Sequence, residues 1–222
     1  MLSSKSVFTV GVMACLAGNL AGEGCRSASG PLLSQRIHTF EAREEFRLPA
    51  LIRLGRENGL CFGIEEADNF NQRITLSLAD IDARSAISAI LGSTQDYDIS
   101  VLHNVILIRD KRLRPPKYLS VRLPRFSIPR STLVSAELNL WMTVEMYLDP
   151  SSKGFAGDRP PGDPTDQVGP FDLREQMVRG LLCRIVENSK GTTWISNPIE
   201  SPVAPAFING LWTFVLYRMQ ND

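Results

Sequence analysis

Within residues 43–110 the chain reads Leu60-Cys-Phe-Gly-Ile64, then Ile74-Thr-Leu-Ser-Leu78, then Tyr97-Asp-Ile-Ser-Val-Leu-His-Asn-Val-Ile-Leu-Ile-Arg109. Apolar and polar residues alternate in the second of these segments, which is typical of a strand buried on one face. The first segment is apolar enough for another strand. The third predicts a hairpin that turns at His103-Asn104, because Asn tolerates the positive φ that a tight hairpin turn requires.

Helices are expected on both sides of the Ile74–Leu78 strand. Residues 40–58 carry apolar side chains at helical spacing, but Pro49 is tolerated only in a first turn, so the helix is expected from about Leu48 to Asn58. Residues 31–39 are expected to form a leader. Asp82 stands where the N-cap of a second helix belongs, and Gly92 ends that helix. These elements predict a two-layer α+β unit, with helices on one face of a sheet whose other face is partly solvated.

This order of helix, strand, strand, helix and hairpin resembles the secretin and TonB N-terminal short domain, a periplasmic interaction module of outer-membrane machines. The resemblance covers residues 43–110, roughly a third of the chain, and rests on patterning that other small α+β folds share. It implies a domain over residues 40–111 that binds proteins and catalyses nothing. In that family the domain usually precedes a pore or a receptor. Neither is expected in the remaining residues, so the resemblance implies that the pore or receptor is a separate chain.

The second half repeats this order loosely, after a basic connector with prolines at Arg112–Lys117. Residues 118–128 alternate like a strand, and residues 133–148 carry a helical apolar stripe. Asp172-Leu-Arg-Glu175 looks like the capping-box start of another helix. Strands are expected at Thr192–Ile195 and Leu211–Tyr217, with a turn at Asn209-Gly210.

Residues 149–170 are rich in Pro, Gly and Asp and predict a long flexible loop. Residues 118–222 are therefore expected to form a second α+β unit, similar to the first and in tandem with it. The alternative is one continuous domain in which the second half extends the first sheet.

The N-terminal residues have the features of a secretory signal. Lys5 gives a positive start, Val7–Ala21 is mostly apolar, and small residues follow. The apolar run is shorter than the ~20 residues that span a membrane. Export with removal of residues 1–24, or as far as residue 29, is therefore expected, and a buried N-terminal helix is the alternative. Export predicts the periplasm of a Gram-negative bacterium as the compartment.

The cysteines bear on this compartment. A lipidated Cys25 or Cys15 would anchor the protein to the outer membrane, but Gly22 and Glu23 before Cys25 do not fit a lipoprotein signal, and the signal before Cys15 would be very short. An oxidising compartment permits a disulfide between Cys61 and Cys183. Both lie among apolar residues, where a free cysteine behaves as a small buried hydrophobe, so two core thiols are favoured over a bridge.

The charge balance argues against several partners. Lys plus Arg and Asp plus Glu are 24 each, so the chain lacks the basic footprint of a nucleic-acid binder and a polybasic anchor for anionic membranes. Direct membrane contact is expected only through a partner or a lipidated cysteine. No phosphate loop or dinucleotide fingerprint occurs, and no Cys or His spacing suits zinc, so neither a cofactor nor a metal is expected.

Catalysis is not expected either. His38 and His103 lie far apart in the sequence, and His103 falls at a hairpin tip, where an exposed polar residue is ordinary. Asp158, Asp163 and Asp166 lack the spacing of a calcium loop. The alternative hypothesis is a secreted hydrolase of an envelope polymer, with these carboxylates and Asp172 in one pocket. The three tryptophans could stack on sugars but fit core packing more simply; they are Trp141, Trp194 and Trp212.

The leading hypothesis is an exported protein–protein interaction module. A partner strand can add to an open sheet edge through main-chain hydrogen bonds, and side-chain pockets then provide selectivity. The candidate edge strand consists of Ile74, Thr75, Leu76, Ser77 and Leu78. The expected partner is an envelope protein: an outer-membrane pore such as a secretin, a TonB-dependent receptor or a signalling regulator. A structural subunit that assembles with itself is a further alternative.

Overall fold

The computed structural model describes residues 32–65, 70–92, 95–151, 167–189, 192–197 and 213–218. Its helices are α1 (Arg47–Asn58), α2 (Ala83–Leu91), α3 (Leu133–Leu148) and α4 (Val178–Asn188), with short 3-10 helices at Leu32–Ser34 and Lys117–Ser120. Its strands are β1 (Arg36–Phe46), β2 (Phe62–Ile64), β3 (Arg73–Asp82), β4 (Tyr97–Leu102), β5 (Val105–Asp110), β6 (Arg122–Ile128), β7 (Ser131–Thr132), β8 (Gln167–Val168), β9 (Phe171–Met177), β10 (Thr192–Asn197) and β11 (Thr213–Arg218). The expected α+β class is confirmed.

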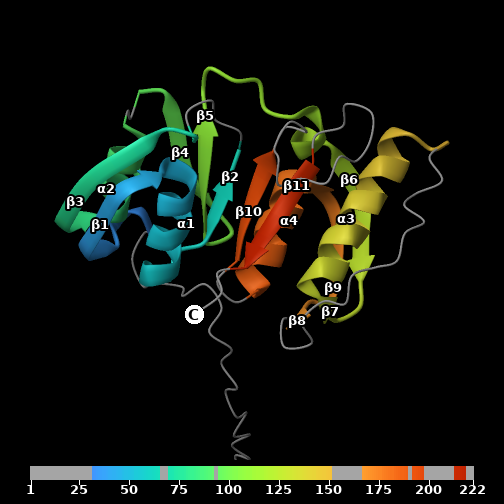
Figure 1. The fold of residues 1–222 in the computed structure, drawn as a ribbon. Coiled ribbons are helices and arrows are strands. Elements are labelled where there is room, and N and C mark those ends of the chain that lie inside the picture. Colours follow the sequence, from blue (N-terminus) through green and yellow to red (C-terminus); the bar gives the residue numbers. More distant parts are fainter. Residues whose placement is uncertain are drawn as a thin grey trace, which may run out of the picture.

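One sheet runs through both halves of the chain. Its strand order is β11-β10-β2-β5-β4, with β10, β2 and β5 parallel and the two outer pairs antiparallel. Two-stranded antiparallel sheets flank it, β1 with β3 on one side and β6 with β9 on the other (Figure 1). The second half thus extends the first sheet, because β10 lies beside β2.

The two halves also share one order of elements. In the first half β1 leads to α1, β3 leads to α2, and the hairpin of β4 and β5 follows. In the second half β6 leads through β7 to α3, β9 leads to α4, and the pair of β10 and β11 follows. The strand before the first helix pairs antiparallel with the strand before the second helix in both halves. We call residues 36–110 the first half and residues 122–218 the second half.

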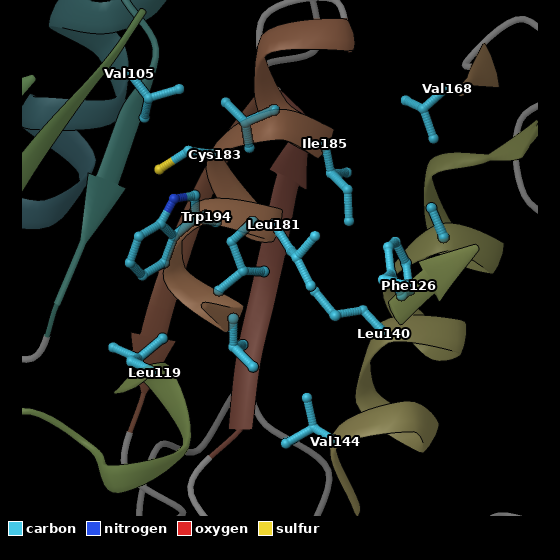
Figure 2. Packing of buried hydrophobic residues seen from close by; sticks show 14 of the residues in the cluster. Val105, Leu119, Phe126, Leu140, Val144, Val168, Leu181, Cys183, Ile185 and Trp194 are labelled. Atoms are coloured by element: carbon cyan, nitrogen blue, oxygen red, sulfur yellow. The ribbon is translucent and has the colours of Figure 1, made fainter. Parts of the chain in front are cut away.

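The shared sheet is buried on both faces. Along β5, Ile106 and Ile108 belong to the core under α1 and α2, whereas Val105 and Leu107 belong to the core under α3 and α4. Trp194 and Ile195 divide β10 in the same way, and Figure 2 shows Trp194 and Val105 within the second core. Each helix pair therefore lies between the shared sheet and one outer sheet. The sequence pattern predicts only two layers, one of helices and one of strands, so the structure contains more layers than expected.

Local signals explain several helix ends. Asp82 caps α2, as expected: its carboxylate accepts from the Ser85 amide at 2.8 Å. The hydrogen bonds from the Ser85 amide and hydroxyl hold the pKa of Asp82 below its usual range. Gly59 and Gly92 end α1 and α2 with φ of 65° and 76°, which glycine adopts without steric cost. The hairpin turn lies at His103-Asn104, both with positive φ, as expected.

Two expectations about strands were wrong. Residues 36–46 form β1, not a leader followed by helix: Ile37, Phe40 and Ala42 are buried against α1 and α2 while the charged side chains between them face solvent. Residues 171–177 form β9, so α4 begins at Val178 rather than near Asp172. Both strands belong to half-exposed two-stranded sheets, where many polar side chains are tolerated and the apolar period is hard to read.

Three of the four strand–helix junctions share a backbone feature. Glu44, Asp80 and Glu175 have φ of 50°, 51° and 51°. Each stands two residues before the N-cap of the helix that follows, which is Phe46, Asp82 or Met177. Arginines of the neighbouring strands support two of these residues, since Arg73 donates to the Glu44 carbonyl at 2.6 Å and Arg122 to the Glu175 carbonyl at 2.9 Å. The repeat thus extends to the positive φ two residues before the N-cap of each of these three helices.

The connector between the halves is packed rather than free. Asp110 is buried and accepts from the Arg112 side chain, which fixes the start of the connector. Tyr118 and Leu119 are buried in the second core, and the Tyr118 hydroxyl lies 2.8 Å from the Ser196 hydroxyl on β10.

Candidate functional site

The candidate edge strand Ile74–Leu78 is the middle of β3. Within the described residues β3 pairs only with β1, so its other edge has no strand beside it. Ile74, Leu76 and Leu78 turn inward and pack against the first core, whereas Thr75 and Ser77 are exposed. The strand extends from Arg73 to Asp82, which is longer than expected. A ten-residue strand with one open edge can accept an added strand.

Charged side chains hold the sheet of β1 and β3 on α1. Arg53 of α1 donates to both Glu45 at 2.6 Å and Glu57 at 2.9 Å, and its guanidinium lies 4.4 Å from the ring centre of Phe40. Hydrogen bonding to Glu45 raises the pKa of Arg53, so the guanidinium stays charged. This network fixes the position of β1, and through β1 it fixes the position of β3.

The contact between the two halves contains a buried ion pair. Glu65, which follows β2, has a side chain that is 4% exposed, and it accepts from Arg179 of α4 at 2.5 and 3.1 Å. Both carboxylate oxygens are bonded, which a buried charge requires. We therefore assign Glu65 a structural role, because both of its carboxylate oxygens already accept hydrogen bonds from Arg179.

The two histidines lie on different elements. His38 is exposed on β1, and its Nδ1 lies 3.3 Å from a carboxylate oxygen of Asp80. His103 was expected to be exposed, but it is partly buried because the hairpin tip packs against α4. Desolvation and then the charge of Arg184 lower the pKa of His103. Its neighbour Asn104 donates to Glu187 of α4 at 2.8 Å, so this tip belongs to the contact between the halves.

The cysteines do not form the expected pair of thiols. Cys61 is disulfide-bonded, whereas Cys183 is a free and fully buried thiol. The two are therefore not joined to each other, as expected, but Cys61 is not a free thiol. Burial raises the pKa of the Cys183 thiol to about 12, so it is protonated at neutral pH and unreactive. Cys15 and Cys25 lie outside the described residues.

Most carboxylates of the hydrolase hypothesis lie outside the described residues. Asp158, Asp163 and Asp166 lie outside the described residues, as do Trp212, the Asn209-Gly210 turn and residues 1–24. Asp172 is exposed on β9 and accepts from Arg125 of β6 at 2.8 and 3.2 Å; this contact lowers the pKa of Asp172. Trp194 is a core residue, as expected, and Trp141 is partly buried against the second core.

A second surface lies along α3, and no signal in the sequence pointed to it. Eleven of the sixteen residues of α3 are apolar, and only Leu133, Ala136, Leu140 and Val144 are buried. The last three residues of the helix are all about half exposed: Met146, Tyr147 and Leu148. The helix contacts β11, which is the outer strand of the shared sheet at that end. An apolar helix face beside an open strand edge is a surface on which an extended segment can bind.

The described residues contain neither a metal-binding cluster nor a helix that could span a membrane. No group of three or more His, Cys, Asp or Glu side chains is placed to hold a metal ion in this part of the chain. Among the same residues, no helix has the length and apolar character needed to cross a membrane.

Comparisons with known proteins do not identify a relative. The chain matches no family model, and neither a curated protein nor a solved structure matches it.

Proposed function

We propose that this chain is an exported protein-interaction module of the bacterial envelope, in which the open edge of β3 binds a strand of a partner protein. The observation that carries the proposal is the position of β3: it has β1 on one side and no strand on the other within the described residues. Added strands bind through main-chain hydrogen bonds, which depend little on side-chain identity. Exposed Thr75 and Ser77 would lie next to the partner strand and contribute selectivity.

Two observations support an envelope location. Cys61 is disulfide-bonded, and disulfides persist in oxidising compartments such as the periplasm. The order α1, β2, β3, α2, β4 and β5 is the order on which the resemblance to the secretin and TonB N-terminal short domain rests. That resemblance leads us to propose an outer-membrane secretin or a TonB-dependent system as the partner, with contact in trans and without a direct membrane anchor.

The test is crosslinking in intact cells. The tagged full chain carries a photo-crosslinking amino acid at Ser77, and mass spectrometry identifies what is attached after irradiation. We expect the attached molecule to be an envelope protein, and we expect the crosslinked residue of that protein to lie in an extended segment. Introducing charge along the edge with Ser77→Lys and Ala79→Lys should abolish the crosslink formed from a probe at Thr75, while the melting temperature stays near that of the unchanged chain.

The control is Ser127→Lys, which places the same charge on exposed β6 of the other outer sheet. It should leave the crosslink intact. Unchanged crosslinking in the β3 variant would refute the edge, and a chain that crosslinks only to copies of itself would favour a structural subunit. A purified chain that degrades an envelope polymer, with loss of activity in Asp158→Asn or Asp163→Asn, would favour the hydrolase.

A further inference from the structure

The repeat identifies a strand position beside β11. In the first half, β5 pairs with β4 on one side and with β2 on the other. In the second half, β11 holds the place of β5 in the element order and pairs with β10. Among the described residues, no strand pairs with the other edge of β11, which is the end of the shared sheet. This edge corresponds to the one that β2 occupies in the first half.

The first half also gives the direction of the strand that fits this position. Phe62, Gly63 and Ile64 of β2 run parallel to Ile106, Leu107 and Ile108 of β5. A strand that takes the corresponding place would therefore run parallel to β11. Parallel pairs form evenly spaced, slanted hydrogen bonds, so the repeat predicts which backbone amides a bound strand would protect.

The helices beside the two positions differ in composition. The twelve residues of α1 include four charged ones, whereas the sixteen residues of α3 include two, Glu137 and Glu145. A helix that is apolar around most of its circumference is usually buried on more than one side. Yet α3 ends in exposed Met146, Tyr147 and Leu148. Its composition therefore suits a helix that a further apolar segment covers.

One position shows how the helix would meet that segment. Gly55 stands nine residues after the α1 N-cap, and a Cβ placed there would come within 2.8 Å of the Phe62 ring of β2. At the same distance from the α3 N-cap stands Trp141, which is partly buried. The first half thus has a small helix residue against a large strand residue. The second half has the large residue on the helix, so its bound strand must carry a small residue there.

The sequence between α3 and β9 disfavours an internal strand at this position. In the first half β2 lies between α1 and β3, and the corresponding residues between α3 and β9 begin at Asp149. Residues 149–166 contain four prolines, three glycines and four aspartates. These residue types are depleted in strands, and proline cannot donate to a ladder.

We propose that the outer edge of β11, together with the adjoining face of α3, accepts an extended and alternately apolar segment of a partner protein, which adds to the shared sheet as a strand parallel to β11. The inference deepens the proposed function, because it gives the module a second binding edge and specifies the partner segment. It does not depend on the edge of β3, so either edge can fail without the other.

The test uses the purified full chain after export and a displayed library of random eight-residue peptides as the probe. We expect the selected peptides to carry apolar residues at every second position, with a small residue among them where Trp141 lies. Hydrogen exchange of the Thr213–Arg218 amides should slow at least tenfold when a selected peptide is added, while the amides of β3 and β4 keep their rates.

Two variants on α3 test the helix face. Met142→Lys should weaken peptide binding at least tenfold, and Met146→Lys, at an exposed position that tolerates charge without unfolding, should weaken it in the same direction. The control is Ser100→Lys, at an exposed position of β4 at the other end of the shared sheet, which should leave peptide binding unchanged.

Four outcomes would overturn the inference. They are the absence of any selected peptide, protection at β3 or β4 in place of β11, peptide binding by both α3 variants as tight as by the unchanged chain, and slow exchange at β11 that follows the concentration of the chain itself. The last would mean that a second copy occupies the edge. Each of them leaves the crosslinking test of β3 unaffected.

Discussion

The two halves of this molecule join the shared sheet in different ways. In the first half β2 pairs with β5 of the same half, whereas in the second half β10 pairs with β2 across the boundary. Trp194 of β10 then packs over Gly63 of β2, within the core of the second half. A repeated order of elements has therefore not produced two independent modules, because the second core needs Cys61, Val105 and Leu107 from the first half.

The largest effect is expected from removing the ion pair between the halves. Arg179→Ala leaves Glu65 buried without its partner, which should cost about 3 kcal/mol of unfolding free energy. Urea unfolding, followed by tryptophan fluorescence, measures the loss. The matched control is Arg125→Ala, which breaks an exposed pair with Asp172 within one outer sheet and should change the midpoint little. If the two variants lose the same free energy of unfolding, the ion pair between the halves contributes no more to stability than the exposed pair does.

A smaller loss is expected from adding one methyl group at the boundary. A Cβ at Gly63 would come within 2.5 Å of the Trp194 ring and 2.6 Å of Leu107, and overpacking of this kind costs roughly 1–3 kcal/mol. The control is Gly180→Ala in α4, where the nearest atoms lie at 3.7 and 4.0 Å. That change should stabilise the chain by up to ~1 kcal/mol, because alanine favours a helix over glycine. Thermal unfolding of both variants checks the opposite signs.

If the halves fold together, Gly63→Ala should lower one common transition. Exchange of the α2 amides and of the α4 amides should then accelerate to the same extent. Independent halves would instead lose protection only in α4, where the second core contacts Trp194.

The boundary is also where sequence reasoning had least to work with. The ends of α2 follow from Asp82 and Gly92, which act within one turn of the helix. By contrast, Glu65 and Arg179 lie 114 residues apart, and no local pattern indicates that a glutamate is buried. The exposed apolar face of α3 could not be predicted for the same reason. Only a comparison with α1 in the folded structure indicates that this face could bind a partner segment.

The sequence does carry one signal of the sheet that both halves share. Val105-Ile-Leu-Ile108 is a continuous apolar run, which is typical of a strand buried on both faces. The hairpin pattern alone predicts a strand with one solvated face, whereas all four side chains of this run are buried. Strands β1 and β9 were missed for the opposite reason: their many charged residues are exposed at outer sheets, so they resemble the polar face of a helix.

A pH-dependent effect is expected at the contact between the hairpin and α4. Desolvation and then Arg184 hold the pKa of His103 below its ordinary 6.5. The unfolded chain therefore binds this proton more readily, and the free energy of unfolding falls as the pH drops through 6.5 and below. His103→Asn keeps the positive φ of the turn and should make the melting temperature less dependent on pH between 7.5 and 5. Arg184→Gln should act in the same direction, and an unchanged pH dependence in both would contradict this account.

The smallest effect concerns the residues with positive φ before the helices, a feature that both halves share. Glu175 adopts a φ of 51°, which costs a residue with a side chain about 1–2 kcal/mol relative to glycine. Glycine removes this cost, but it also makes the unfolded chain more flexible, which offsets part of the gain in folding stability. Glu175→Gly should therefore stabilise the chain by a few tenths of a kcal/mol to ~1 kcal/mol. Glu44→Gly should gain less, because its carboxylate accepts from the Thr75 hydroxyl at 2.9 Å and the variant loses this bond. Thermal unfolding of the two variants orders them, and a larger gain at Glu44 would show that the contact with Thr75 does not offset the strain.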